Sequence, residues 1–299
     1  MIKAVSFDFY NTLVHFWPPL EEIQQAACHE LGLTVSEEAI THGYAVADVL
    51  FNRENEDRPL SQRTDEERLE FFSRYEQLIL ETAGISVSMD LAKSVWKMAI
   101  AVPKDFVPFD DAVPTLEKLR KAGYKVGIIT NLRRDLGELC QQVGLTPYLD
   151  FAVGSQEVGI EKPHPPIFMA ALNKLNTAPE ECLHVGDQVR SDVFGAQGVG
   201  MKAVLIDRSG FGADGADFLT ISILSFLFFL FFVLPYLLFS FFPFLLPSFF
   251  LSFSPSSPFL PSSLPFPFPL FFPLLLSLTP PSPFSFPSLL SLLFSPPLP

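Results

Sequence analysis

Short apolar runs alternate with longer amphipathic stretches over most of the chain up to residue 217. The first run, residues 3–7, is partly β-branched and stops at Asp8, which predicts a buried strand that delivers a carboxylate to a sheet edge. Later runs of the same character are residues 124–130, 151–153, 182–187 and 202–207. Stretches with helical spacing separate these runs and stop at glycines such as Gly123 and Gly144. Strands that alternate with helices predict an α/β fold whose parallel sheet is covered on both faces.

Residues 15–105 follow a different pattern, because apolar positions recur there at helical spacing and no strand pattern occurs. The predicted helices of this region begin near Pro19, Ser36, Thr64 and Ser88. We therefore expect a helical insertion directly after the first strand. It would divide the α/β core into residues 1–14 and 106–217.

The last part of the chain has neither a helical nor a strand period. From Leu224 to Pro299 all but three residues are Phe, Leu, Pro or Ser, the amino acids whose codons can consist of pyrimidines alone. We therefore expect residues 218–299 to be a disordered or artefactual low-complexity tail, produced by translation of pyrimidine-rich DNA, and not a folded domain. A membrane tail is the alternative, because residues 218–234 form a proline-free apolar run close to the ~20 residues of a spanning helix. Prolines beyond this run and the absence of flanking Lys or Arg argue against that alternative.

Charge and cysteine content narrow the possible partners and location. The formal net charge is −13, and no charged residue follows Asp217. An acidic domain without a basic stripe argues against nucleic acid and anionic membranes as partners. The three cysteines are scattered and lack the spacing of a metal site, which indicates a reducing compartment. Because no export signal precedes the first strand, we expect a cytoplasmic protein, and its oligomeric state is left open.

Polar residues follow the predicted strands at matching positions. They are Asp8 after the first strand, Thr130 and Asn131 after the second, Lys162 in the loop after the third, and Asp187 with Asp192 after the fourth. Each has an ordinary explanation when taken singly, such as a helix cap or a solvated lysine. Because the carboxyl ends of parallel strands meet at one edge of a sheet, we expect the whole set to converge on one site.

Together these motifs resemble those of the haloacid dehalogenase-like superfamily of hydrolases. The resemblance covers the first strand and the later α/β part, and it implies a Rossmann-like core with the inserted helices as an α-helical cap domain over the site. By this resemblance Asp8 is the nucleophile and Thr130, with Asn131 beside it, holds the transferring group. Lys162 would neutralise the charge on that group.

The same resemblance implies a magnesium site. Asp187 would be a metal ligand, and Asp192 would support either the metal shell or Lys162. Mg²⁺ prefers oxygen ligands, usually one or two carboxylates with substrate phosphate and water, and Asp8, Asp187 and the carbonyl of Tyr10 would meet that demand. A carboxylate that attacks phosphorus divides one difficult displacement into two easier ones. We therefore expect a Mg²⁺-dependent phosphatase that acts on a small anionic phosphomonoester.

Tyr10 departs from the pattern of the family's phosphatases, which usually carry a second Asp there as general acid and base. A phenol with an ordinary pKa of ~10 is a poor base at neutral pH. Tyrosine at this position is similar to the 2-haloacid dehalogenase branch, which is the first alternative. Phe168, where that branch has Tyr, and Gly186-Asp187, where it has Ser and Asn, favour the phosphatase. The second alternative is a phosphate-ligand binding or regulatory protein with weak turnover.

Overall fold

The computed structural model describes residues 1–211 and 218–228, and these residues form a six-stranded sheet with the order β5-β4-β1-β6-β7-β8. The strands are β1 (Ala4–Phe7), β4 (Lys125–Thr130), β5 (Phe151–Gly154), β6 (Cys182–Gly186), β7 (Lys202–Ile206) and β8 (Thr220–Ile221). All neighbouring pairs in this sheet are parallel. The predicted α/β class with a Rossmann-like sheet is therefore confirmed. The order of strands reverses at β1, which is where open α/β sheets place their ligands.

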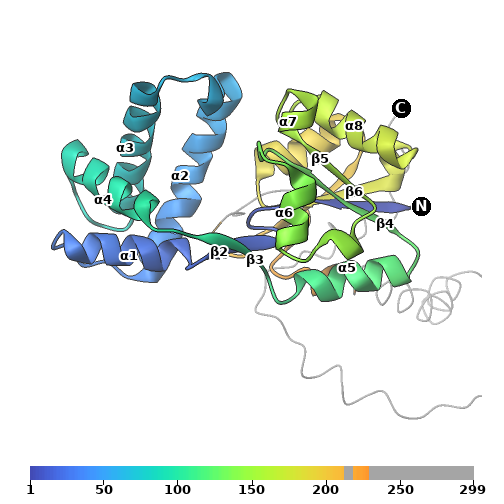
Figure 1. Ribbon diagram of the computed structural model, residues 1–299, viewed down its shortest axis with the longest axis horizontal. Helices are drawn as coiled ribbons and strands as arrows, with labels where there is room; N and C mark the ends of the chain where they lie inside the picture. Colours follow the sequence, from blue (N-terminus) through green and yellow to red (C-terminus); the bar gives the residue numbers. More distant parts are fainter. Residues whose placement is uncertain (212–217, 229–299) are drawn as a thin grey trace, which may run out of the picture. The chain divides into compact units, whose positions relative to one another are not determined.

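Helices lie on both sides of this sheet, with α8 above the strands and α5 below them in Figure 1. The helices of the α/β part are α5 (Ala112–Lys121), α6 (Leu136–Gln142), α7 (Ser155–Val158), α8 (Pro165–Leu175), α9 (Gly195–Gly198) and α10 (Ser225–Phe228). A π-helical turn spans Val189–Phe194, and 3₁₀ turns span Leu60–Gln62, Thr146–Tyr148 and Pro179–Glu181. Helix α6 starts at Leu136, because Asp135 caps it by accepting a hydrogen bond from the Glu138 N–H at 2.9 Å.

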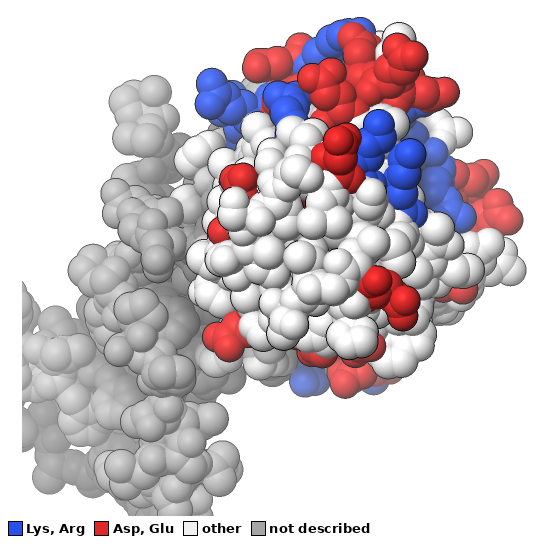
Figure 2. Space-filling model, turned by 90° about the vertical axis from the view of Figure 1, so that its left-hand side faces the viewer, with Lys and Arg blue, Asp and Glu red and all other residues white. Residues whose placement is uncertain are grey.

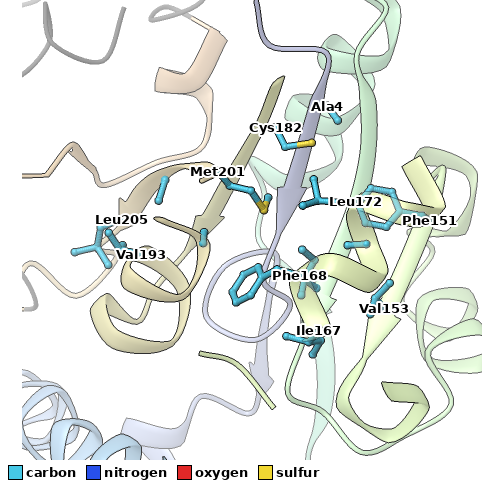
Figure 3. Packing of buried hydrophobic residues seen from close by; sticks show 14 residues of the cluster. Ala4, Phe151, Val153, Ile167, Phe168, Leu172, Cys182, Val193, Met201 and Leu205 are labelled. Atoms are coloured by element: carbon cyan, nitrogen blue, oxygen red, sulfur yellow. The ribbon is translucent and has the colours of Figure 1, made fainter. Parts of the chain in front are cut away.

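The face of the sheet beneath α8 holds a dense apolar cluster (Figure 3). The register pairs Ala4 with Lys125 on one side and with Cys182 on the other, so alternate residues of neighbouring strands share this face. Phe168 and Leu172 of α8 are buried against these strands. This packing fixes the carboxyl ends of β1, β4 and β6 relative to one another.

The chain leaves the α/β part through β2 (Val14–Trp17) and returns through β3 (Asp105–Pro108), and these two strands pair antiparallel. Between them lie α1 (Leu20–Glu30), α2 (Glu37–Asp57), α3 (Asp65–Thr82) and α4 (Met89–Ala101), which we call the helical segment. The side chains of Ser36, Thr64 and Ser88 each accept a hydrogen bond from the N–H three residues later, which confirms these predicted helix starts. The short β2–β3 ribbon was not predicted.

Figure 2 shows the side of the molecule on which the helical segment lies. Acidic and basic side chains mix at the top of this view, and a broad uncharged area lies beneath them. Oppositely charged side chains form ion pairs near α2 and α3, such as Arg58 with Glu67 and Arg63 with Glu54. The visible part of the described chain therefore offers no continuous basic surface.

The sheet continues past Asp217, where we expected the core to end. Strand β8 pairs in parallel with β7, and Leu219 and Leu227 are buried. Residues 218–228 therefore belong to the core, which differs from the predicted boundary because these apolar residues extend the sheet and cover its lower face. The rest of the predicted tail, residues 229–299, lies outside the described residues. No helix among the described residues has the length and apolar character needed to cross a bilayer.

Candidate functional site

Asp8 stands at the carboxyl end of the central strand. Its backbone N–H donates to the carbonyl of Val185 in β6 at 2.8 Å, so the chain is still held to the sheet at this point. The residue is only 8% exposed. Burial raises the pKa of the Asp8 carboxyl, and the ammonium of Lys162 opposes this shift. The position of β1 between β4 and β6 thus places Asp8 where the loops of three strands meet.

Lys162 connects Asp8 to Asp192. Its Nζ lies 2.6 Å from Oδ1 of Asp8 and 2.5 Å from Oδ1 of Asp192. Burial favours the neutral amine, but the two carboxylates raise the pKa of Lys162 overall, so the ammonium stays charged. Burial also favours neutral Asp192, yet the charge of Lys162 and the hydrogen bond with His184 hold the pKa of Asp192 below its ordinary value. The result is a buried ion triad at the sheet edge.

Further contacts fix Asp192 in this triad. Its Oδ1 lies 3.0 Å from Nε2 of His184, and its Oδ2 accepts the backbone N–H of Gln188 at 3.0 Å. Nδ1 of His184 lies 2.9 Å from the Ser6 hydroxyl. Because burial lowers the pKa of His184, a neutral ring that donates from Nε2 and accepts at Nδ1 satisfies both contacts. Gly186 makes room for this approach, since a Cβ there would lie 2.2 Å from Cγ of Asp192.

Asn131 holds the backbone of Lys162 from the neighbouring strand end. Its Nδ2 donates to the Lys162 carbonyl at 3.1 Å, and its Oδ1 accepts the Lys162 N–H at 2.6 Å. The hydroxyl of Thr130 is buried and accepts the N–H of Leu132 at 3.3 Å, which leaves the hydroxyl proton available for another acceptor. The loop after β4 is thereby tied to the loop that carries the lysine.

Asp187 adds a third carboxylate. Ligand-competent oxygens of Asp8, Asp187 and Asp192 all lie within 4.8 Å of one another. Burial raises the pKa of Asp187 well above its ordinary value, and the negative charges of Asp8 and Asp192 add to this shift. The ammonium of Lys162 pairs with two of these carboxylates, Asp8 and Asp192. Their surplus negative charge and oxygen chemistry fit a hard divalent cation.

Tyr10 packs among aromatic rings at the foot of the β2–β3 ribbon. Its ring centroid lies 5.0 Å from that of Phe16 and 6.0 Å from that of Phe106. Burial, followed by the negative charges of Asp48 and Asp187, raises the pKa of Tyr10 well above its ordinary value. The phenol therefore keeps its proton at neutral pH.

Residues 2–200 match the model of a protein family described as haloacid dehalogenase-like hydrolase. The chain is a member of this family. The sequence motifs, the parallel sheet and the charged cluster at its edge thus belong to a known class of hydrolases, and the family resemblance seen in the sequence is confirmed.

Relatives of this haloacid dehalogenase-like hydrolase include phosphatases. It is 32% identical over 215 residues to a ribulose-1,5-bisphosphate 5-phosphatase of Halopiger xanaduensis, an alignment that covers 70% of this chain and 86% of the relative. It is 39% identical over 102 residues to a glyceraldehyde 3-phosphate phosphatase of Methanopyrus kandleri, covering 34% of this chain and 44% of the relative. A solved structure of a dehalogenase shares the fold, with a TM-score of 0.50 and 22% identity over 76% of this chain and 96% of that chain.

In this haloacid dehalogenase-like hydrolase Asp8, Lys162, Asp187 and Asp192 lie together at the sheet edge, and the catalytic and metal-binding roles expected of the whole set stay predictions. Sequence reasoning missed His184, which was treated as part of an apolar strand. A polar residue inside an otherwise apolar strand, on the face shared with Ser6, was the available signal. It also gave no sign of Asp48 in α2, whose negative charge contributes to the raised pKa of Tyr10 and Asp187, because a single charged residue on a helix has no distinctive pattern.

Proposed function

We propose that this hydrolase is a Mg²⁺-dependent phosphatase that acts on a small phosphomonoester through an aspartyl-phosphate on Asp8. The observation that carries the proposal is the carboxylate of Asp187 within 4.8 Å of those of Asp8 and Asp192. A third carboxylate there repels an anionic substrate unless a divalent cation intervenes, which is the requirement of phosphoryl transfer. Two relatives are named ribulose-1,5-bisphosphate 5-phosphatase and glyceraldehyde 3-phosphate phosphatase, and these names support a small phosphorylated molecule as the substrate.

In this mechanism the residues of the chain share the work of positioning and charge neutralisation. An oxygen of Asp8 forms a bond to phosphorus while the bond to the leaving oxygen breaks, and water later releases phosphate from Asp8. Lys162, still charged, places its ammonium beside the attacking carboxylate and the phosphoryl oxygens. The Thr130 hydroxyl, which accepts the N–H of Leu132, donates its own proton to a phosphoryl oxygen. Asn131 keeps the lysine in place through its two backbone contacts.

The residues present suit a magnesium ion. Asp8 and Asp187, with the carbonyl of Tyr10, would hold it, since these are the hard oxygen ligands that Mg²⁺ takes. Both oxygens of Asp192 already have protein partners, so this residue supports the site through Lys162. When bound, the ion supplies positive charge for the phosphoryl oxygens.

The helical segment acts as the cap of this site. Nδ2 of Asn55 in α2 donates to Oε2 of Glu161 at 2.7 Å, directly before Lys162 in the chain. This contact brings α2 onto the loop that carries the lysine. A closed cap would exclude water from the reacting groups and let their charges act at full strength.

Phosphate release from a panel of small phosphomonoesters, measured with Mg²⁺ or with a chelator, tests the proposal. We expect release that requires Mg²⁺ and disappears in Asp8→Asn. Asp65→Asn, the same substitution at an exposed residue of α3, is the matched control and should keep the wild-type rate. Release that persists in the chelator or in Asp8→Asn would contradict the proposed mechanism.

A specific observation, Tyr10 in place of the second carboxylate, supports two other functions. Tyr10 in place of the second carboxylate favours a 2-haloacid dehalogenase, and halide release from a 2-haloacid in the presence of a chelator would select that function. Loss of the same carboxylate also favours a phosphate-ligand binding protein with weak turnover. Phosphomonoester binding without release, unchanged by Asp8→Asn, would select this second function.

A further inference from the structure

The proposed phosphatase lacks a carboxyl group two residues after its nucleophile, where Tyr10 stands. Tyr10 keeps its proton and its ring is packed against Phe16 and Phe106. An alkoxide is a poor leaving group, so cleavage of an alkyl phosphate is much faster when an acid protonates the leaving oxygen. The group that does so must come from another element of the chain.

Helix α2 turns one face toward the site. Asn55 on this face donates to Glu161, the residue before Lys162. Asp48 lies seven residues earlier, which is about two turns of an α-helix, so it shares the face of Asn55. The side chain of Asp48 is half-buried. A carboxyl group of α2 thus lies on the same helix face as the residue that contacts the loop of Lys162.

The surroundings of Asp48 suit proton transfer. The O–H of Tyr75 in α3 donates to Oδ1 of Asp48 at 2.5 Å and orients the carboxyl group. The charge of Asp48 also contributes to the raised pKa of Tyr10, Tyr44 and Asp187, and the first and last of these lie at the proposed site. Burial raises the pKa of Asp48 to about 6, although the hydrogen bond from Tyr75 opposes the shift. A carboxyl group with such a pKa can give and take a proton near neutral pH.

We propose that Asp48 is the general acid and base of the reaction, in place of the carboxylate that Tyr10 has displaced. This inference rests on the proposed phosphatase function. In the first step the P–O bond to the leaving group breaks as the Asp8–phosphorus bond forms, and the leaving oxygen takes the proton of the Asp48 carboxyl. In the second step a water oxygen bonds to phosphorus as the Asp8–phosphorus bond breaks. Asp48 takes the water proton and is restored, and inorganic phosphate leaves.

Leaving groups that differ in their need for a proton provide the test. The full chain and its Asp48→Asn variant would be compared in single turnovers with p-nitrophenyl phosphate, whose nitrophenolate leaves without a proton, and with glycerol 3-phosphate, whose alkoxide does not. We expect the variant to cleave p-nitrophenyl phosphate at nearly the wild-type rate in the first turnover and then to stall as the aspartyl-phosphate. With glycerol 3-phosphate the first turnover should slow by roughly 10²- to 10⁴-fold.

Two further variants complete the design. Asp57→Asn makes the same change at an exposed position of α2 and should behave as wild type with both substrates. Tyr75→Phe removes the donor that orients Asp48 and should slow glycerol 3-phosphate more than p-nitrophenyl phosphate, which tests the inference even if Asp48→Asn does not fold. Equal losses on both substrates, or no loss, would overturn the role of Asp48. No phosphate release by the wild-type chain from these two substrates or from any other member of the phosphomonoester panel would overturn the phosphatase function itself, and this inference with it.

Discussion

Replacing Lys162 by methionine should destabilise the protein strongly, because it leaves two buried carboxylates without their cation. The ammonium lies 2.6 Å from Asp8 and 2.5 Å from Asp192, and its side chain is 2% exposed. At an effective dielectric of ~20, charges at these separations attract by roughly 6 kcal/mol per pair. Most of this attraction compensates for desolvation, and removing one partner of a buried pair typically costs about 3–5 kcal/mol. For a domain of this size that loss lowers the unfolding midpoint by about 6–20 °C.

The assay is thermal unfolding followed by circular dichroism in a chelator, at neutral and at mildly acidic pH. In the wild type the lowered pKa of Asp192 adds stability above its unfolded value of ~3.9, and this stability is lost as the pH falls through the folded pKa. In Lys162→Met that contribution is absent, and burial raises the pKa of the carboxylates left without a cation, which costs further stability above ~4. The deficit of the variant should therefore be largest near neutral pH and shrink toward pH ~4, as these carboxylates take up protons. The part that comes from Asp192 should be lost only below ~4. Added Mg²⁺ should recover part of it. Lys125→Met, at an exposed pair with Asp150, is the control and should cost well under ~1 kcal/mol. A midpoint within about 2 °C of wild type would refute the triad as the source of this stability.

Other substitutions test the remaining features of the site. Gly186→Ala should displace Asp192 and cost about 1–3 kcal/mol of unfolding free energy. Gly198→Ala is the control and should be tolerated, because no atom lies within 4 Å of the added Cβ. Equal unfolding midpoints for the two variants would contradict this expectation. Asn131→Ala should cost about 1–3 kcal/mol in denaturant titrations, because it leaves the backbone groups of the site lysine unpaired, and an unchanged denaturation midpoint would show that water replaces the amide. Because the pKa of Asp48 is raised to about 6, the stability of the wild type should fall as the pH rises from ~4 to ~6. Asp48→Asn should therefore stabilise the fold by about 2–3 kcal/mol above pH ~6 and by little near pH ~4. A difference in unfolding midpoint that does not depend on pH would argue against the raised pKa.

The sheet and the meeting of its polar strand ends were predictable because both follow from local pattern and a general rule of topology. Apolar runs that stop at Asp8, Thr130 and Asp187 identify strands, and parallel strands place those ends at one edge. The contact of Lys162 with two carboxylates then follows from proximity and charge. The pattern does not show which residues support the side chains of the site, as His184 supports Asp192 by a hydrogen bond.

Features that depend on distant partners escaped prediction for a physical reason. The strands of the β2–β3 ribbon have four residues each, and each is stabilised by a partner far along the chain and by stacking such as that of Phe16 on Phe106. Strand β8 consists of Thr220 and Ile221 and exists because β7 offers a free edge. The face of α2 that carries Asp48 is defined only by its tertiary contacts. Helix spacing marks a core-facing stripe but does not say which polar face meets a substrate.

The antiparallel ribbon has a consequence for how this protein changes over evolutionary time. Val14 pairs with Pro108 and Trp17 with Asp105, so the helical segment begins and ends at neighbouring points of the host. The closure cost of such an insertion grows slowly with its length, by only ~0.6 kcal/mol for each doubling. Helices can therefore lengthen, shorten or diverge in sequence while the paired stem stays the same. The stretch that carries the proposed nucleophile Asp8 and the stretch that carries the proposed proton donor Asp48 are therefore separate parts of the chain, free to change at different rates.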